Sequence, residues 1–239
     1  MMINIDIKGD IIEEDDKWFY DWIGWNYTSA KNVIRGLKEA NGQPVNIKIN
    51  SPGGSVFAAS EIYTELRNYS GDVNIQILGI AASAASVIAM AGKSSMSPTA
   101  QIMVHNVSSG VSGDYRAMEH TAEILKNANQ TIANSYVAKS GMSMEKALDL
   151  MNNETWLTAQ QAKELGLVDE IMFEDNTKVN LSNSNLKGLY NTFSSIPEEI
   201  LKKFNIENKS QPIVNNNKVD FFIKQKAQSE LDLLILGGK

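Results

Sequence analysis

Apolar strands that end in turns of small residues are the most constraining feature of this sequence. Val45–Ile49 has the composition of a strand and runs into Asn-Ser-Pro-Gly-Gly at 50–54. Val73–Leu78 repeats the arrangement and runs into Gly-Ile-Ala-Ala-Ser-Ala-Ala-Ser at 79–86. A helical segment follows each turn, and alternating strands and helices predict βαβ units with a mostly parallel sheet. Both turns then lie at the carboxyl edge of the sheet, where α/β proteins usually bind their ligands.

The remaining elements fit the same α/β scheme. Residues 3–7 alternate apolar and polar side chains, as a half-buried strand does, and Gly9-Asp10 is expected to end that strand. Asn26–Ser29 offers cap residues for a helix over Ala30–Ala40. Further helices are expected at Val56–Tyr69, Val87–Ala91, Tyr115–Lys139, Met144–Met151 and Thr158–Leu165, and further strands at Gln101–Val104 and Leu167–Met172.

A change of composition after Phe173 divides the chain into three parts. Residues 1–173 form the predicted α/β domain. Residues 174–218 are rich in Asn, Ser and Lys, which indicates a polar linker that contains a short helix. Residues 219–239 have apolar side chains at helical spacing and predict an amphipathic helix. This helix either packs on its own or a neighbouring subunit, or it binds a scaffold or another partner.

Charge and composition exclude several classes of protein. The net charge of −6 argues against nucleic acid or an anionic membrane as the main partner. No stretch approaches the ~20 apolar residues that span a bilayer, and the first residues lack the basic and apolar regions of a secretory signal. Cysteine is absent, which excludes disulfides, thiol catalysis and cysteine metal sites. These features predict a cytoplasmic protein.

Ser83 lies in the second small-residue turn, between a strand end and a helix start. A serine hydroxyl needs a neighbouring base, and donors for the oxyanion, before it acts as a nucleophile. The first N–H groups of a helix are unpaired and the local dipole is positive, so negative charge is favoured there. The neighbours Ala81, Ala82, Ala84 and Ala85 are small enough to let a peptide backbone approach. Tight packing of a helix produces the same composition, so the turn alone does not establish a site.

The two histidines limit the choice of base. His105 follows the apolar strand Gln101–Val104, whereas His120 lies between Glu119 and Glu123 on a predicted helix surface. We therefore interpret His120 as a solvated helix residue. His105 remains the candidate base, and a structural histidine is the alternative interpretation. Two histidines also exclude a histidine-rich metal site, and no metal is expected.

The first small-residue turn offers backbone donors. Pro52 is followed by Gly53 and Gly54, and consecutive glycines can expose N–H groups that hold an oxyanion or an extended peptide. An ordinary loop is the alternative. No nucleotide-binding fingerprint occurs, so no nucleotide and no other cofactor is expected on this chain.

The order of these motifs resembles the ClpP family of serine peptidases. Residues 49–54 (INSPGG) match the glycine-rich turn of that family, and residues 78–86 (LGIAASAAS) fit its serine signature. Met103-Val104-His105 fits the start of its histidine signature. Gly113–Ser143 is similar to its long handle helix, and Ala162–Ile171 is similar to its closing segment.

This resemblance covers residues 3–173 and implies both a fold and a set of roles. The fold is the ClpP/crotonase-like α/β fold of repeated ββα units with a protruding handle helix, followed here by a C-terminal extension. By position, Ser83 is the nucleophile and His105 the base. The N–H groups of Gly54 and Ala84 form the oxyanion hole, and Gly53 shapes the turn. The expected activity is that of a serine endopeptidase on protein or peptide substrates.

The third catalytic residue of the family is an aspartate two residues before an aromatic-Leu-Ser/Thr stretch. Glu154 holds this position, before Trp156-Leu157-Thr158. A glutamate can orient a histidine and stabilise the imidazolium, although its extra methylene changes the backbone placement that the role requires. Asp149 and Asp169 are the alternative acids.

Departures from the family pattern indicate a subclass. The sequence starts directly at the first predicted strand, where Clp subunits have a segment that forms axial loops for the unfoldase ring, so docking to a Clp ATPase is not expected. This start and the C-terminal extension resemble the ClpP-type head-maturation (prohead) proteases of tailed phages, which process capsid or scaffold proteins in the bacterial host cytoplasm. Asn106-Val107 replaces the usual Gln-Pro, and Asn152-Asn153 replaces charged residues of the contact between rings. A homo-oligomeric heptameric ring is therefore expected rather than a double ring.

Four other functions remain as alternatives. The first is an ATP-dependent Clp proteolytic subunit that works with an unfoldase. The second is a crotonase-like acyl-CoA enzyme, which needs no Ser–His pair. The third is a Ser–Lys peptidase, for which Lys93 is the nearest lysine. The fourth is an inactive assembly or scaffold subunit, against which the presence of Ser83, His105 and the Gly-Gly turn argues.

Overall fold

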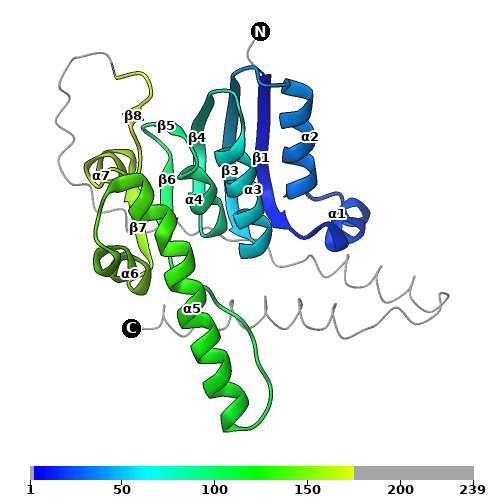
Figure 1. Cartoon of the computed structure of the whole chain (residues 1–239), viewed down its shortest axis with the longest axis vertical. Coiled ribbons are helices and arrows are strands. Elements are labelled where there is room, and N and C mark those ends of the chain that lie inside the picture. The colour runs from blue at the N-terminus through cyan, green and yellow to red at the C-terminus, as the bar shows by residue number, and fades with distance from the viewer. Residues whose placement is uncertain (1–2, 175–239) are drawn as a thin grey trace. The chain divides into compact units, whose positions relative to one another are not determined.

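A mostly parallel sheet of eight strands forms the centre of the fold in the computed structural model, which describes residues 3–174 (Figure 1). The strands are β1 (Ile3–Ile12), β2 (Tyr27–Ser29), β3 (Val45–Gly54), β4 (Val73–Ala82), β5 (Lys93–Met96), β6 (Gln101–Val104), β7 (Thr155–Thr158) and β8 (Glu170–Ile171). The helices are α1 (Lys17–Ile23), α2 (Ala30–Ala40), α3 (Val56–Asn68), α4 (Ala84–Ala89), α5 (Tyr115–Ser140), α6 (Met144–Asn152) and α7 (Ala159–Glu164), with a short 3-10 turn at Glu14–Asp16.

Parallel pairing dominates this sheet. Six strands follow one another in the order β2-β1-β3-β4-β5-β8, and every pair along this path is parallel. β6 pairs in parallel with the end of β4, and it pairs antiparallel with β7. The α/β fold with a mostly parallel sheet is therefore confirmed, with β7 as the antiparallel exception.

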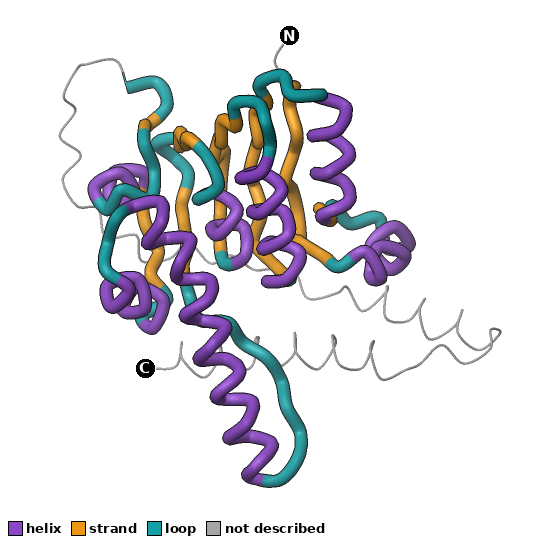
Figure 2. The backbone as a smooth tube through the Cα atoms, in the orientation of Figure 1, coloured by secondary structure: helices purple, strands orange, loops and turns teal. Residues whose placement is uncertain are grey.

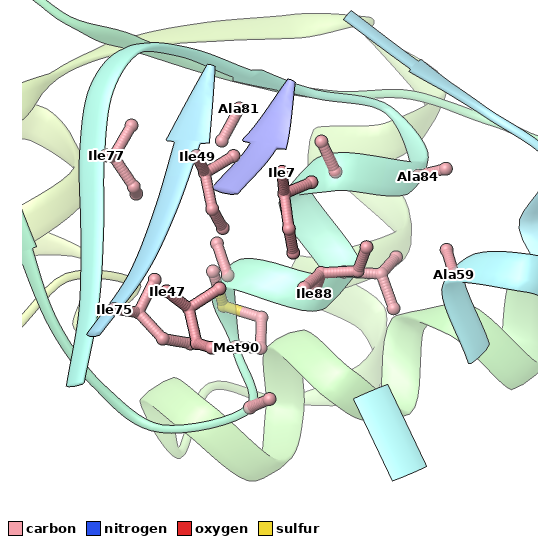
Figure 3. Close-up of a cluster of buried hydrophobic side chains, with 14 of the residues drawn as sticks. Ile7, Ile47, Ile49, Ala59, Ile75, Ile77, Ala81, Ala84, Ile88 and Met90 are labelled. Atoms are coloured by element: carbon pink, nitrogen blue, oxygen red, sulfur yellow. The ribbon is translucent and has the colours of Figure 1, made fainter. Parts of the chain in front are cut away.

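One face of the sheet is apolar and packs against helices. Figure 3 shows this core, where Ile7 of β1, Ile49 of β3 and Ile77 of β4 point toward α4. Helices α2, α3 and α4 lie side by side along this face (Figure 2). The other face is polar, because Asn4, Asn46 and Asn74 alternate with the buried residues and pair with one another across β1, β3 and β4. The alternation identifies a sheet covered by helices on one side.

The long helix α5 extends beyond the sheet (Figure 1). Its buried residues, Ile132, Ala133, Ser135 and Tyr136, all lie in its C-terminal half. Asp114 caps its start, and its carboxylate accepts hydrogen bonds from the N–H groups of Arg116 and Ala117. The expected protruding handle helix is therefore present, anchored at its C-terminal end.

Strand lengths are where the sequence predictions were least accurate. β1 does not end at Gly9-Asp10 but continues to Ile12, with an irregularity in its pairing to β3 between Lys8 and Asp10. β3 and β4 likewise run through the predicted turns as far as Gly54 and Ala82. Backbone pairing to the neighbouring strands outweighs the turn preference of glycine at these positions.

One α-helix and three strands were not predicted, namely α1, β2, β5 and β7, and neither was the 3-10 turn at Glu14–Asp16. β2, β5 and β7 have only three or four residues each, too few for a periodic pattern. Of the expected cap residues at Asn26–Ser29, the last three form the strand β2, and the Ser29 hydroxyl makes no cap hydrogen bond. The closing strand expected at Leu167–Met172 is reduced to β8.

Contacts group residues 3–108 and 113–174 into a first compact unit. All the elements above belong to the first unit. The predicted linker beyond residue 174 and the predicted amphipathic helix at 219–239 lie outside the described residues. Among residues 3–174, none of the helices has the length and apolarity that a bilayer crossing requires, and no three His, Asp or Glu side chains gather as metal ligands do.

Candidate active site

Ser83 occupies the junction between β4 and α4. Its backbone has φ 53° and ψ −125°, a conformation that a residue with a side chain rarely adopts. Such strain persists when surrounding contacts enforce it, and it is common at functional sites. One enforcing contact is the hydrogen bond from Ser83 N–H to the Met103 carbonyl of β6, at 2.9 Å. The junction thus holds the Ser83 side chain at the carboxyl edge of the sheet.

His105 follows the last residue of β6 and lies beside Ser83. The pairing of Ala82 with Met103 brings the ends of β4 and β6 together. His105 Nε2 lies 2.7 Å from Ser83 Oγ, which is hydrogen-bond distance. Both residues are half-buried. The sequence predicted this pair from residues that are far apart in the chain.

Burial controls the protonation of His105. Desolvation lowers the pKa of its imidazole below the usual 6.5, and the negative charge of Glu154 raises it in part. The imidazole is therefore neutral at pH 7, and Nε2 accepts the Ser83 hydroxyl proton when Nδ1 carries the ring hydrogen. A neutral imidazole at this distance is able to act as a general base.

The Gly53-Gly54 segment runs directly against the Ser83 junction. A Cβ atom at Gly53 would lie 2.7 Å from both Ser83 Cβ and the Ala82 carbonyl oxygen, and 3.0 Å from Ala84 N. No side chain fits at that separation, so glycine is required for the close approach. The two small-residue segments expected to meet at the sheet edge therefore do meet, and the Ala84 N–H lies beside them.

Gly54 is constrained by β1 rather than by Ser83. Its φ is 140°, and a Cβ atom there would lie 2.1 Å from the Ile11 carbonyl oxygen. Ile11 also accepts a hydrogen bond from Ser55 N–H at 2.7 Å. These contacts fix the last residues of β3 next to the site.

Glu154 lies just before β7, and the strand register brings it to His105. β6 and β7 are antiparallel and pair Val104 with Thr155, so the next residue on each side, His105 and Glu154, faces the other. Glu154 has φ 43°, an uncommon conformation that turns the chain into β7. Its side chain is exposed, and Oε1 accepts a 3.4 Å hydrogen bond from the Trp156 indole.

Comparison with known proteins assigns the chain to a family. The family model described as Clp protease matches residues 25–175, well over half of the chain. The chain belongs to the Clp protease family. This membership agrees with the resemblance seen in the sequence motifs.

Several curated relatives support the same family assignment. An ATP-dependent Clp protease proteolytic subunit of Bacteroides fragilis is 36% identical over 136 residues, which cover 56% of this chain and 66% of that protein. Subunit 1 of Chlamydia abortus is 35% identical over 141 residues, covering 56% of this chain and 73% of that protein. Subunit 1 of Streptomyces avermitilis is 36% identical over 155 residues, covering 64% and 71%. The chain thus spans about two thirds of the length of these Clp relatives.

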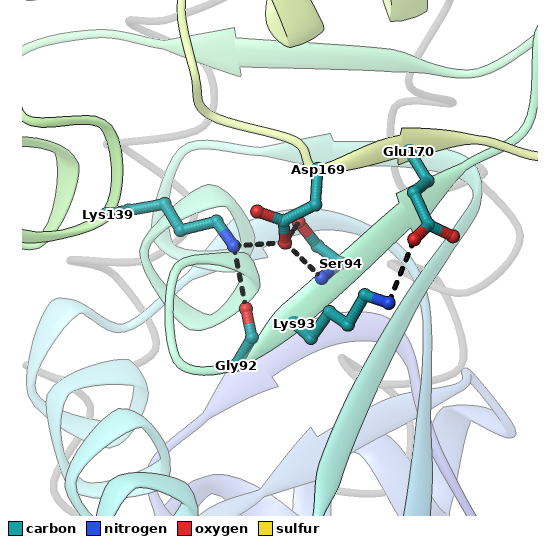
Figure 4. Close-up of polar contacts among 6 residues, drawn as sticks. All are labelled: Gly92, Lys93, Ser94, Lys139, Asp169 and Glu170. Atoms are coloured by element: carbon teal, nitrogen blue, oxygen red, sulfur yellow. Dashed lines mark hydrogen bonds and ion pairs between the residues drawn. The ribbon is translucent and has the colours of Figure 1, made fainter.

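Asp169, one of the alternative acids, lies away from the Ser83–His105 pair. The Asp169 carboxylate accepts hydrogen bonds from Ser94 N–H at 2.6 Å and from Lys139 Nζ (Figure 4). Ser94 pairs with Ile75, seven residues before Ala82 on β4, so Asp169 is roughly 20 Å from the Ser83 junction. It belongs to the opposite end of the sheet.

Two further candidates are engaged elsewhere. Asp149 is exposed at the end of α6, where Asn153 Nδ2 donates to its Oδ1 at 3.1 Å. Lys93 forms an ion pair with Glu170 at 2.8 Å, at the end of the sheet that carries Asp169 (Figure 4). Lys93, the lysine considered for the Ser–Lys alternative, is therefore far from Ser83.

Two of the positions that depart from the family pattern, Asn106 and Asn152, contact each other. Asn106 Nδ2 donates to Asn152 Oδ1 at 2.9 Å. Asn106 follows His105 directly, and Asn152 precedes Glu154 by two residues. A neutral amide pair therefore joins the two segments that carry His105 and Glu154.

Sequence reasoning missed two hydroxyl groups behind the Ser83 junction. Ser86 is fully buried on α4, and its Oγ donates to the Ser83 carbonyl oxygen at 2.6 Å. Tyr136 is buried on α5, and its hydroxyl lies 2.7 Å from Ser86 Oγ. Ser86 belongs to the quoted serine motif, but no local pattern links it to a tyrosine fifty residues later.

Proposed function

We propose that this chain is a serine endopeptidase that cleaves peptide bonds through an acyl-enzyme. The observation that carries this proposal is the 2.7 Å separation of Ser83 Oγ and His105 Nε2, at a sheet edge where the Gly53 backbone closes on the junction. Membership of the Clp protease family and relatives named as protease subunits support it.

The mechanism begins when His105 Nε2 takes the proton of the Ser83 hydroxyl. Ser83 Oγ then attacks the scissile carbonyl carbon, and the carbonyl oxygen becomes an oxyanion. The N–H groups of Gly54 and Ala84 stabilise that charge because they are fixed before the reaction begins. The intermediate collapses when the imidazolium gives its proton to the leaving amine, and the acyl group stays on Ser83.

Hydrolysis of the acyl-enzyme repeats the steps with water. His105 takes a proton from a water molecule, the hydroxide adds to the ester carbonyl, and the returning proton restores the Ser83 hydroxyl. In both halves the imidazolium is the charged intermediate form, and the neighbouring Glu154 carboxylate stabilises it.

An activity-based probe tests the nucleophile. A fluorophosphonate is expected to label the purified chain, and Ser83→Ala is expected to abolish the labelling while the melting temperature stays close to the wild-type value. Ser60→Ala, which removes a hydroxyl from α3, serves as the matched control and should be labelled fully. Labelling that persists in Ser83→Ala would contradict the assignment.

A homo-oligomeric ring, most simply a heptamer, is the proposed assembly. The projecting half of α5 exposes large apolar side chains, with Tyr115 at 69%, Met118 at 53% and Ile124 at 51% exposure. Such a surface is typical of a helix that contacts other subunits. Native mass measurement should give an assembly with about seven times the subunit mass. A monomer at physiological salt would argue against a ring.

The substrate distinguishes two versions of this peptidase. One is a head-maturation protease that processes capsid or scaffold proteins without an ATPase. The other is an ATP-dependent proteolytic subunit, which the names of the relatives favour. A folded reporter protein with a degradation tag separates them, because the second version degrades it only when a Clp ATPase and ATP are added. Cleavage of a capsid or scaffold precursor by the chain alone supports the first version.

A further inference from the structure

A chain of buried hydroxyl groups connects α5 to the Ser83 junction. Tyr136 OH lies 2.7 Å from Ser86 Oγ, and Ser86 Oγ lies 2.6 Å from the Ser83 carbonyl oxygen. The same carbonyl also accepts a hydrogen bond from Ser86 N–H at 2.9 Å. Ser86 is 0% exposed and Tyr136 is 2% exposed, so water does not compete for these bonds.

The number of available hydroxyl hydrogens fixes which group donates in each of these hydrogen bonds. Ser86 has one hydroxyl hydrogen, which it donates to the Ser83 carbonyl, because that oxygen can only accept. The Tyr136 hydroxyl must therefore donate to Ser86 Oγ. Burial raises the pKa of Tyr136 to about 12, so it keeps its hydrogen over the neutral range.

The Ser83 carbonyl belongs to the same peptide group as the Ala84 N–H. A trans peptide is planar, and its C=O and N–H bonds point in opposite directions. Two donors that hold the Ser83 carbonyl on one side therefore fix the direction of the Ala84 N–H on the other. The Ala84 nitrogen lies beside Gly53, since it is 3.0 Å from the position of a Cβ atom built on that glycine.

We propose that Tyr136 and Ser86 are positioning residues that aim the Ala84 N–H at the oxyanion. The inference rests on the proposed function, since it concerns the oxyanion hole of that peptidase. Ser83 has an unfavourable φ of 53°, and a strained backbone conformation persists only when its surroundings hold it. The hydrogen bonds made by Ser86 and Tyr136 supply such support. Tyr136, which orients the Ala84 N–H through Ser86, belongs to α5, the helix whose N-terminal half projects from the sheet.

The test uses Ser86→Ala and Tyr136→Phe, each of which deletes one oxygen atom. Complete loss of an oxyanion donor costs about 10²–10³ in kcat, and a donor that is merely less well aimed should cost about tenfold. We expect each variant to lower kcat for a peptide amide about tenfold and to leave KM within about twofold. A peptide boronate, whose tetrahedral adduct carries an oxygen in the oxyanion position, should lose affinity by the same factor as kcat.

Coupling between the two positions separates positioning from general stabilisation. Because Tyr136 acts through Ser86, the double variant should lose no more activity than Ser86→Ala does alone. Ser135→Ala is the matched control, since it removes a neighbouring buried hydroxyl of α5 whose hydrogen-bond partner among residues 3–174 is the Ile132 carbonyl. That variant should keep the wild-type kcat and boronate affinity.

The outcomes are distinct. Folded Ser86→Ala and Tyr136→Phe proteins with wild-type kcat and boronate affinity would overturn the inference, as would losses that add in the double variant or recur equally in Ser135→Ala. Failure of the proposed function itself looks different, because then the wild-type chain shows no hydrolysis that depends on Ser83.

Discussion

Glu154 and His105 face each other where the antiparallel pairing of β6 and β7 ends. The register pairs Val104 with Thr155, so these two residues are the next opposed positions. The Glu154 charge raises the pKa of His105, against the larger lowering by burial. Within the described part of the chain, no hydrogen bond joins the two side chains, and Glu154 accepts one from Trp156 instead. The carboxylate therefore acts on the imidazole through its charge.

Glu154→Gln is expected to lower kcat and to shift the pH profile. The charge that stabilises the imidazolium is lost, so kcat should fall, by about 10-fold to 100-fold given the exposed position of this carboxylate. Because Glu154 raises the pKa of His105, its removal should move the acidic limb of kcat/KM to lower pH. Steady-state kinetics from pH 5 to 8 measures both effects.

Glu154→Asp is the matched variant, since it keeps the charge on a shorter side chain. It should keep the acidic limb closer to the wild-type position than Glu154→Gln does. An unchanged kcat in Glu154→Gln, or an acidic limb that moves to higher pH, would exclude Glu154 as the third catalytic residue.

The pKa of His105 makes a separate prediction for the wild-type chain. Activity requires the neutral imidazole, and burial lowers its pKa below 6.5. The acidic limb of kcat/KM should therefore have its midpoint below pH 6.5, as the ring gains a proton there. A kcat/KM profile with an acidic limb centred above pH 7 would contradict the neutral, desolvated state of His105.

Gly53→Ala is expected to lower activity, whereas Gly54→Ala is expected to lower stability. An alanine at 53 collides with the Ser83 junction, so activity should fall at least tenfold in protein that remains folded. An alanine at 54 collides with the Ile11 backbone of β1, so it should mainly lower the melting temperature. Activity per folded molecule and thermal unfolding separate the two effects.

Gly141→Ala is the control for backbone strain in this comparison. Gly141 has φ 75°, but apart from Gly141 itself and its two chain neighbours, no atom in the described part of the chain lies within 4 Å of the position of an added Cβ. Its substitution should cost about 1 kcal/mol of stability from strain alone and should leave activity per folded molecule unchanged. Equal losses of activity at 53 and 141 would show that the collision with Ser83 is unimportant.

The Ser83–His105 pair was predicted through the resemblance of the ordered motifs to the ClpP family, because the strand ends alone left a tightly packed turn and a structural histidine as alternatives. Glu154 followed from its position before Trp156, but its register with His105 required β7, which is too short for a periodic pattern. Tyr136 was beyond prediction, because its partner Ser86 is reached only through the packing of α5 on α4. The local sequence pattern predicts which residues lie at the ends of strands. It does not predict which residues of two distant helices come into contact, because that depends on how the helices pack.

Asp169→Asn is expected to change stability rather than catalysis. Desolvation raises the pKa of Asp169, but hydrogen bonds from Lys139 and Ser94 outweigh it and hold the pKa below its ordinary 3.8. A lowered pKa stabilises the fold at pH values above the ordinary value, and this contribution is lost as pH falls through the folded-state pKa. Because the Asp169 side chain is 40% exposed, the variant should lose only about 1 kcal/mol of its free energy of unfolding at pH 7. This loss of stability should become smaller toward pH 3.

Asp149→Asn provides the control, because Asp149 lies 3.7 Å from Lys146 in an exposed pair that contributes little. Chemical denaturation at several pH values measures the stability of both variants, and peptide hydrolysis per folded molecule measures their activity. Both variants should hydrolyse the peptide at the wild-type rate. A steep loss of kcat in Asp169→Asn with normal stability would contradict this placement of Asp169 and would mean that Glu154 is not the acid of the site.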